Sequence, residues 1–146
     1  MNPIADSRSA SNRPVVAAAL GTVGVVHVLL TGVLFGDSVR SVLGGGVFAS
    51  IDADPSVADL RGIGFWYVTA GLAMILLAGV VGWIELRTGT VPGFLGWALL
   101  ALAVWGVVLM PVSPFWVFAL VAVLAFRSSR RAKTRPLPAV ATRAPD

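Results

Sequence analysis

The chain has 146 residues and a formal net charge of +4; 57% of its residues are hydrophobic and only 12% are charged. A soluble domain carries about a quarter charged residues, which cover its surface, so this composition excludes an ordinary soluble protein and predicts one that uses lipid as its main solvent. Because the chain has no cysteine, thiolate metal sites, disulfides and cysteine nucleophiles are excluded.

The first predicted membrane span covers residues 15–35. These 21 residues carry no formal charge, and as a helix they reach roughly 31 Å, which matches the thickness of a bilayer hydrocarbon core. The run is longer than the apolar part of a signal peptide, so we expect it to be retained. Residues 1–14 are polar and are predicted to form a disordered cytoplasmic arm.

An acidic extracytoplasmic loop is predicted over residues 36–61. It holds four of the seven acidic residues, and the glycines at 44–46 interrupt any helix there. Towards its end, Asp54 and Pro55 are typical of an N-cap and a first helical position. The next helix is therefore predicted to begin near Pro55, outside the membrane.

Three further spans are predicted over residues 63–84, 94–110 and 113–129. Each is an apolar run without a central charge, and a backbone in lipid must satisfy its hydrogen bonds within a helix. Glu85 and Arg87 close the second span at the interface, where we expect them to form a weak surface ion pair.

Two prolines separate the third and fourth spans. Pro111 and Pro114 favour a tight turn; the alternative is three crossings, with residues 94–126 as one long kinked helix. Residues 132–146 are Pro-rich and basic and are predicted to be a disordered tail. The membrane domain is thus predicted over residues 15–131, as an all-α, integral membrane four-helix bundle.

Loop charges predict the orientation of these spans. Nine of the eleven basic residues fall on the side that holds both termini, and the other side has only Arg40 and Arg61. The positive-inside rule therefore places the N and C termini in the cytoplasm and predicts a multi-pass protein of the bacterial cytoplasmic (inner) membrane.

The predicted partners are the lipid bilayer and a second copy of the chain. Nucleic acid is not a predicted partner, because the basic residues flank the spans and form no face that reads bases. Five basic residues near the C-terminus are expected to attract anionic lipid headgroups: Arg127, Arg130, Arg131, Lys133 and Arg135.

The single histidine lies in the first span, in the stretch GVVHVLLTG. At 100° per residue, His27 shares one stripe of the helix with Ala17, Gly21, Gly24 and Thr31. Small residues on a stripe let another helix approach closely, so His27 is expected to face the bundle interior. It either forms an interhelical hydrogen bond or serves as an intramembrane ligand.

Two pairs of small residues, each four positions apart, also predict close helix packing. They are Gly32 with Gly36 at the end of the first span and Ala78 with Gly82 in the second. Residues at this spacing lie on one face of a helix, and a second backbone can approach over them.

The aromatic stretch GFWYVTAG opens the second span. It is typical of an interfacial aromatic belt, and it can also line a pocket for a quinone or a lipid. The candidate cofactor-binding residues are therefore His27, Thr31, Trp66 and Tyr67, with haem or quinone as the alternative to no cofactor.

Motifs for catalysis and metal binding are missing from the sequence. The acidic loop lacks the spacing of a calcium loop, and no metalloprotease, hydrolase or nucleotide-binding motif occurs. No catalytic or metal-ligating residue is predicted.

Three parts of the sequence resemble a known family. They are the histidine in GVVHVLLTG, the aromatic opening GFWYVTAGLAMILLAG, and the stretch VPGFLGWALLALAVWGVVLMPVSPFW. Over about residues 15–126 they resemble a group of small bacterial four-span membrane proteins of unknown function, similar in layout to DoxX-like proteins. Pro114 stands where this pattern has a glycine. The resemblance implies a fold and a membrane location, and no established activity.

These observations predict an integral inner-membrane protein without catalysis of its own, which serves as a packing or partner module. The alternative is a redox accessory protein that binds haem or quinone through His27 and the aromatic residues Trp66 and Tyr67. A second alternative is a small-solute carrier or pore. Coupled transport is disfavoured, because no span has a central charged residue.

Overall fold

The structure is a computed structural model that describes residues 13–133, with side chains as far as residue 130. This part of the chain is all-helical and has no strand, which confirms the all-α part of the prediction. The predicted arm and basic tail lie almost entirely outside the described residues. By length and composition, the first and third helices are long and apolar enough to cross a membrane. The five helices are α1 (Val15–Leu34), α2 (Gly36–Gly44), α3 (Ala58–Thr88), α4 (Gly93–Leu109) and α5 (Trp116–Lys133).

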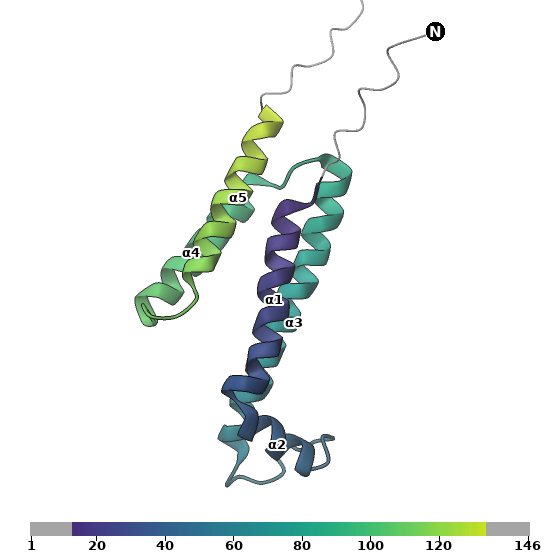
Figure 1. The fold of residues 1–146 in the computed structure, drawn as a ribbon, viewed down its shortest axis with the longest axis vertical. Coiled ribbons are helices and arrows are strands. Elements are labelled where there is room, and N and C mark those ends of the chain that lie inside the picture. The colour runs from purple at the N-terminus through teal and green to yellow at the C-terminus, as the bar shows by residue number, and fades with distance from the viewer. Residues whose placement is uncertain (1–12, 134–146) are drawn as a thin grey trace, which may run out of the picture.

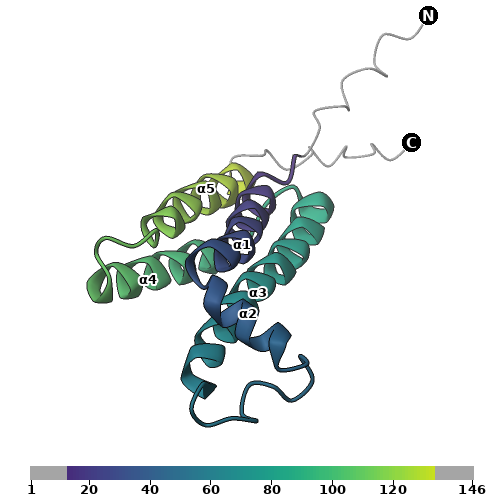
Figure 2. The ribbon, with the colours of Figure 1, turned by 60° about the horizontal axis from the view of Figure 1, so that its bottom comes forward.

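The four longer helices form two antiparallel hairpins (Figure 1). In one hairpin α1 packs along α3, with α2 beyond the end of α1, and in the other α4 packs against α5. The hairpins meet where α1 begins and α3 ends, and they diverge towards the turn between α4 and α5 (Figures 1 and 2). The connection between α3 and α4 is short because Gly89 adopts a left-handed conformation, with φ of 75°, and ends α3.

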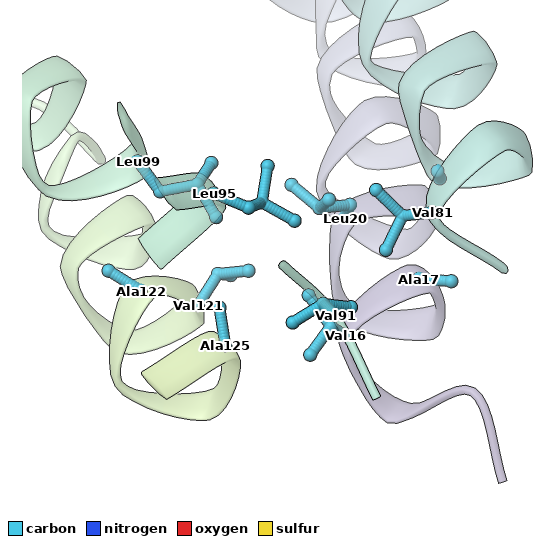
Figure 3. Close-up of a cluster of buried hydrophobic side chains, with 11 residues drawn as sticks. Val16, Ala17, Leu20, Val81, Val91, Leu95, Leu99, Val121, Ala122 and Ala125 are labelled. Carbon is cyan, nitrogen blue, oxygen red and sulfur yellow. The ribbon is translucent and has the colours of Figure 1, made fainter. Parts of the chain in front are cut away.

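The hydrophobic core lies at the end where the hairpins meet (Figure 3). All four long helices and the connection between α3 and α4 contribute to it, and Leu20 of α1 is completely buried there. The other core residues are Val16, Ala17, Ala78, Val81, Val91, Leu95, Leu99, Val121, Ala122 and Ala125. The two hairpins are therefore joined through one end of the molecule.

Backbone contact between α1 and α3 occurs at two glycines. A Cβ added at Gly24 would lie 2.9 Å from the carbonyl oxygen of Gly71, and one added at Gly71 would lie 3.1 Å from that of Gly24. Nearer the core, a Cβ at Gly82 would lie 3.2 Å from the Cβ of Ala17. The predicted small-residue stripe of α1 is confirmed as its contact with α3. The predicted pair that begins at Gly32 packs against no helix of the described chain, since nothing lies within 4 Å of that position.

Glycines also bring α4 and α5 together, each beneath a phenyl ring. A Cβ at Gly96 would lie 2.7 Å from the Phe126 ring, and a Cβ at Gly106 would overlap the Phe115 ring. The chain therefore turns back after α4. The alternative of one kinked helix over residues 94–126 is wrong, because α4 and α5 lie side by side and run in opposite directions.

The segment predicted as an acidic loop, residues 36–61, contains the additional helix α2, so the described chain has one helix more than the predicted bundle. The helix ends at Gly44, at the start of the glycine run. Arg61 holds the segment in place: its Nε donates to Ser41 Oγ at 2.9 Å and its Nη1 donates to the Ser50 carbonyl at 2.6 Å. In the sequence, Arg61 counts as a charge of the acidic loop. In the structure, it ties α2 and the following loop to α3.

The start of α3 also differs from its prediction. The Asp54 carboxylate accepts hydrogen bonds from Ser56 Oγ at 2.7 Å and from Ser56 N at 2.9 Å. These two bonds hold the pKa of Asp54 below its ordinary value, and the bond from the Ser56 hydroxyl has the larger effect. They form an Asx turn that precedes the helix, and α3 begins at Ala58 rather than at Pro55.

The predicted ion pair between Glu85 and Arg87 is wrong. Glu85 is only 5% exposed and its carboxylate accepts hydrogen bonds from Val16 N at 3.3 Å and Ala17 N at 2.9 Å. The first N–H groups of a helix have no partner within it and attract negative charge, and the residue before α1 provides no side-chain cap. Glu85 of α3 therefore caps α1, while the Arg87 guanidinium lies over the Trp83 ring, 4.7 Å from its centre.

The close contact of α1 with α3 at Gly24 predicts that Gly24→Ala destabilises the folded protein, because the new methyl group meets the backbone of α3. The expected loss is about 1–3 kcal/mol, the usual cost of overpacking. Gly32→Ala is the matched control, since its methyl group meets nothing within 4 Å. Thermal unfolding of both purified variants in detergent, followed by circular dichroism, measures the difference. Equal midpoints would show that α1 and α3 do not touch at Gly24.

The capping contact predicts that Glu85→Ala lowers the free energy of unfolding by about 0.5–2 kcal/mol, the range measured for lost helix caps. Arg87→Ala is the control and should change it by less than about 0.5 kcal/mol, as is usual for exposed surface positions. The same unfolding measurement applies. An equal loss in the two variants would favour the ion pair instead of the cap.

Candidate functional site

His27 and Tyr67 form a parallel stack between α1 and α3. Their ring centres are 3.8 Å apart and their planes differ by 9°. The other neighbour of Tyr67 is the tilted ring of Phe35, 4.8 Å away. Within the described part of the chain neither the imidazole nitrogens nor the phenol hydroxyl forms a hydrogen bond. The partner of His27 is therefore an aromatic ring, and the predicted interhelical hydrogen bond is not formed.

This stack lines a cavity of about 280 Å³ between the two hairpins. We call it the α1–α5 cavity; its wall consists of α1 residues between Thr22 and Leu30, Tyr67 of α3, and four residues at the turn into α5: Pro114, Phe115, Val117 and Phe118. No charged side chain lines it. The Thr22 hydroxyl donates to its own helix, to Ala18 O at 2.9 Å. His27 and Tyr67 are thus the polar groups that remain available in an otherwise apolar cavity.

The two other candidate residues lie away from the α1–α5 cavity. Thr31 is 1% exposed, and its hydroxyl donates to the His27 carbonyl at 3.2 Å, one helical turn back. Trp66 is 68% exposed and its ring contacts Phe65, 5.1 Å away. The structure therefore brings His27 and Tyr67 together and places Thr31 and Trp66 elsewhere.

The opposite wall of the α1–α5 cavity was not predicted from the sequence. Phe115 lies just before α5 and Phe118 in its first turn, and their ring centres are 6.0 Å apart. In the predicted fourth span, their spacing of three residues would place both rings on one helix face, which was a usable signal. Only the packing of Phe115 over Gly106 shows which way that face is turned.

The residues present do not fit haem. A porphyrin carries carboxylate groups, and no cationic side chain lines the α1–α5 cavity to receive them. Among the described residues, no three His, Asp or Glu side chains come together in a way that could hold a metal ion.

The basic residues expected to meet anionic lipid are only partly described. Arg127 and Arg130 are exposed near the end of α5. The side chains of Arg131 and Lys133, and the whole of Arg135, lie outside the described residues, so the headgroup contact stays a prediction.

Comparison with known proteins gives a family and no activity. No curated protein and no solved structure matches the chain. One family profile covers residues 11–132, which include nearly all of the described helices. The chain belongs to DUF6463, a family of unknown function.

Proposed function

We propose that the protein is a multi-pass integral membrane protein of the bacterial cytoplasmic membrane. The observation that carries the proposal is the outward direction of its large apolar side chains: Val33 of α1 is 78% exposed, Leu76 of α3 73% and Val108 of α4 74%. Only 28% of the apolar stretch of α1 and 17% of that of α3 is buried. A core helix of a soluble protein would be mostly covered, and water does not tolerate apolar faces of this extent.

The antiparallel hairpins support a four-span topology made by α1, α3, α4 and α5. The start of α1, the end of α3 and the end of α5 lie at the same end of the molecule (Figure 1). Arg87, Arg127 and Arg130 belong to that end, and the acidic segment over residues 36–61 belongs to the other. This charge distribution favours both termini in the cytoplasm.

A packing or partner role fits this architecture better than catalysis. The half of the molecule beyond the core exposes large apolar side chains on both hairpins. Helix α4 has 17 residues, which reach roughly 26 Å against a hydrocarbon core of about 30 Å. Association in the membrane plane is one way in which short spans accommodate this mismatch. We infer that the partner is a second copy of the chain.

Single-cysteine labelling tests the topology, because the natural chain has no cysteine and gives no background. In intact cells a membrane-impermeant maleimide is expected to label Ala53→Cys, in the loop before α3, and to leave Gly93→Cys unlabelled until the cells are lysed. Both positions are exposed. Labelling of the two variants from the same side would contradict the four-span topology.

Membrane integration and self-association are measured on the unmodified chain. Alkaline carbonate washing is expected to leave the protein in the membrane pellet, and its release into the supernatant would contradict integration. Light scattering of the detergent-purified protein, with bound detergent subtracted, is expected to give twice the chain mass of 15.2 kDa. A strictly monomeric mass would contradict the inferred partner.

A further inference from the structure

We propose that the α1–α5 cavity binds a neutral, lipid-soluble ring compound that accepts hydrogen bonds, of the quinone class. This inference rests on the proposed membrane placement and deepens it by assigning a ligand chemistry to the cavity.

The first support is the state of the polar groups. The stack of His27 on Tyr67 orients both rings without using their hydrogen-bonding atoms. A neutral imidazole still offers one donor and one acceptor, and a phenol offers a donor. In an apolar cavity surrounded by lipid, each such group without a hydrogen-bond partner destabilises the protein. A ligand with carbonyl oxygens satisfies both donors.

The absence of charge in the wall defines the charge of the ligand. The lining includes no Lys, Arg, Asp or Glu side chain, so a phosphate, a carboxylate or an ammonium group would enter without a counter-ion, which is costly in a low-dielectric site. Phospholipid headgroups and haem propionates are disfavoured by the same argument. A neutral carbonyl compound has no such cost.

Size and shape favour a flat ring. The cavity of about 280 Å³ is near the lower limit of the volumes of roughly 300–1,000 Å³ that small-molecule sites occupy. Phe115, just before α5, and Phe118, in its first turn, form one wall, and His27 and Tyr67 contribute the other rings. Aromatic side chains on two walls suit a planar ring, which gains from offset or edge contacts with them.

The position along α1 suits a molecule that is dissolved in the membrane. His27 lies 12 residues after Val15, which is about 18 Å along the helix and therefore near the middle of the hydrocarbon core. Val26 lines the cavity and is 46% exposed, so the cavity is not closed off beside α1. The cavity thus opens sideways between α1 and α5, towards the acyl chains, where a ring with an apolar tail can enter.

Calorimetric titration of the full chain in phosphatidylcholine nanodiscs tests the proposal. The probe is a benzoquinone with a short alkyl tail, and the signal of empty nanodiscs is subtracted. The wild-type chain is expected to show saturable binding at one site. Tyr67→Phe and His27→Phe keep an aromatic ring in the stack and remove its polar atoms, so each should weaken binding roughly tenfold, the effect of one lost hydrogen bond.

Two controls separate this site from simple partitioning. Trp66→Phe changes an aromatic residue next to Tyr67 in sequence but outside the cavity, and should bind the probe like the wild type. The alkyl tail alone, added as an alcohol, should show no saturable binding to the chain. Melting curves of all variants confirm that they are folded.

Three results would overturn the proposal. They are uptake of the probe without saturation, equal affinity of Tyr67→Phe, His27→Phe and the wild type for the probe, and saturable binding of the alcohol. These outcomes are distinct from failure of the membrane placement. Carbonate release or same-side cysteine labelling would refute the placement, whereas a chain that passes those tests and binds no probe refutes only the ligand.

Discussion

The backbone contact between Gly24 and Gly71 determines the arrangement of the α1–α3 hairpin. With no side chain at either position, the two helices meet at carbonyl and amide groups, which sets their register. One turn further along, the same antiparallel register places His27 against Tyr67. In the other direction it places Glu85 beside the first turn of α1. One steric constraint therefore positions both the buried carboxylate and the aromatic stack.

The second consequence comes from how the two hairpins are joined. The core connects them only at the end that holds the start of α1 and the end of α3 (Figure 3), so the other ends diverge. The α4–α5 hairpin is stiffened by its own ring-over-glycine contacts at Gly96 and Gly106. Phe115 packs over Gly106 of α4 and also lines the α1–α5 cavity, which lies between the hairpins.

Two charged side chains, Glu85 and Arg61, connect segments of the described chain. Glu85 satisfies amide groups at the start of α1 that apolar neighbours cannot satisfy, and Arg61 joins α2, its loop and α3 through hydroxyl and carbonyl oxygens. Neither residue forms an ion pair in the described part of the chain. The buried Glu85 and the half-buried Arg61 each have a specific structural partner.

The sequence by itself determined the helical class, the long apolar helices, the turn at Pro111 and the stripe on which α1 meets another helix, because these depend on local hydrophobicity, on proline and on helical periodicity. It identified His27 and Tyr67 as candidates without showing that they touch. Tertiary structure alone decided the partner of Glu85, the role of Arg61, the exclusion of Trp66 from the α1–α5 cavity and the contribution of Phe115. The physical reason is that these depend on how helices far apart in sequence rotate and align, and that rotation follows from a few glycine contacts whose partners local patterns do not specify.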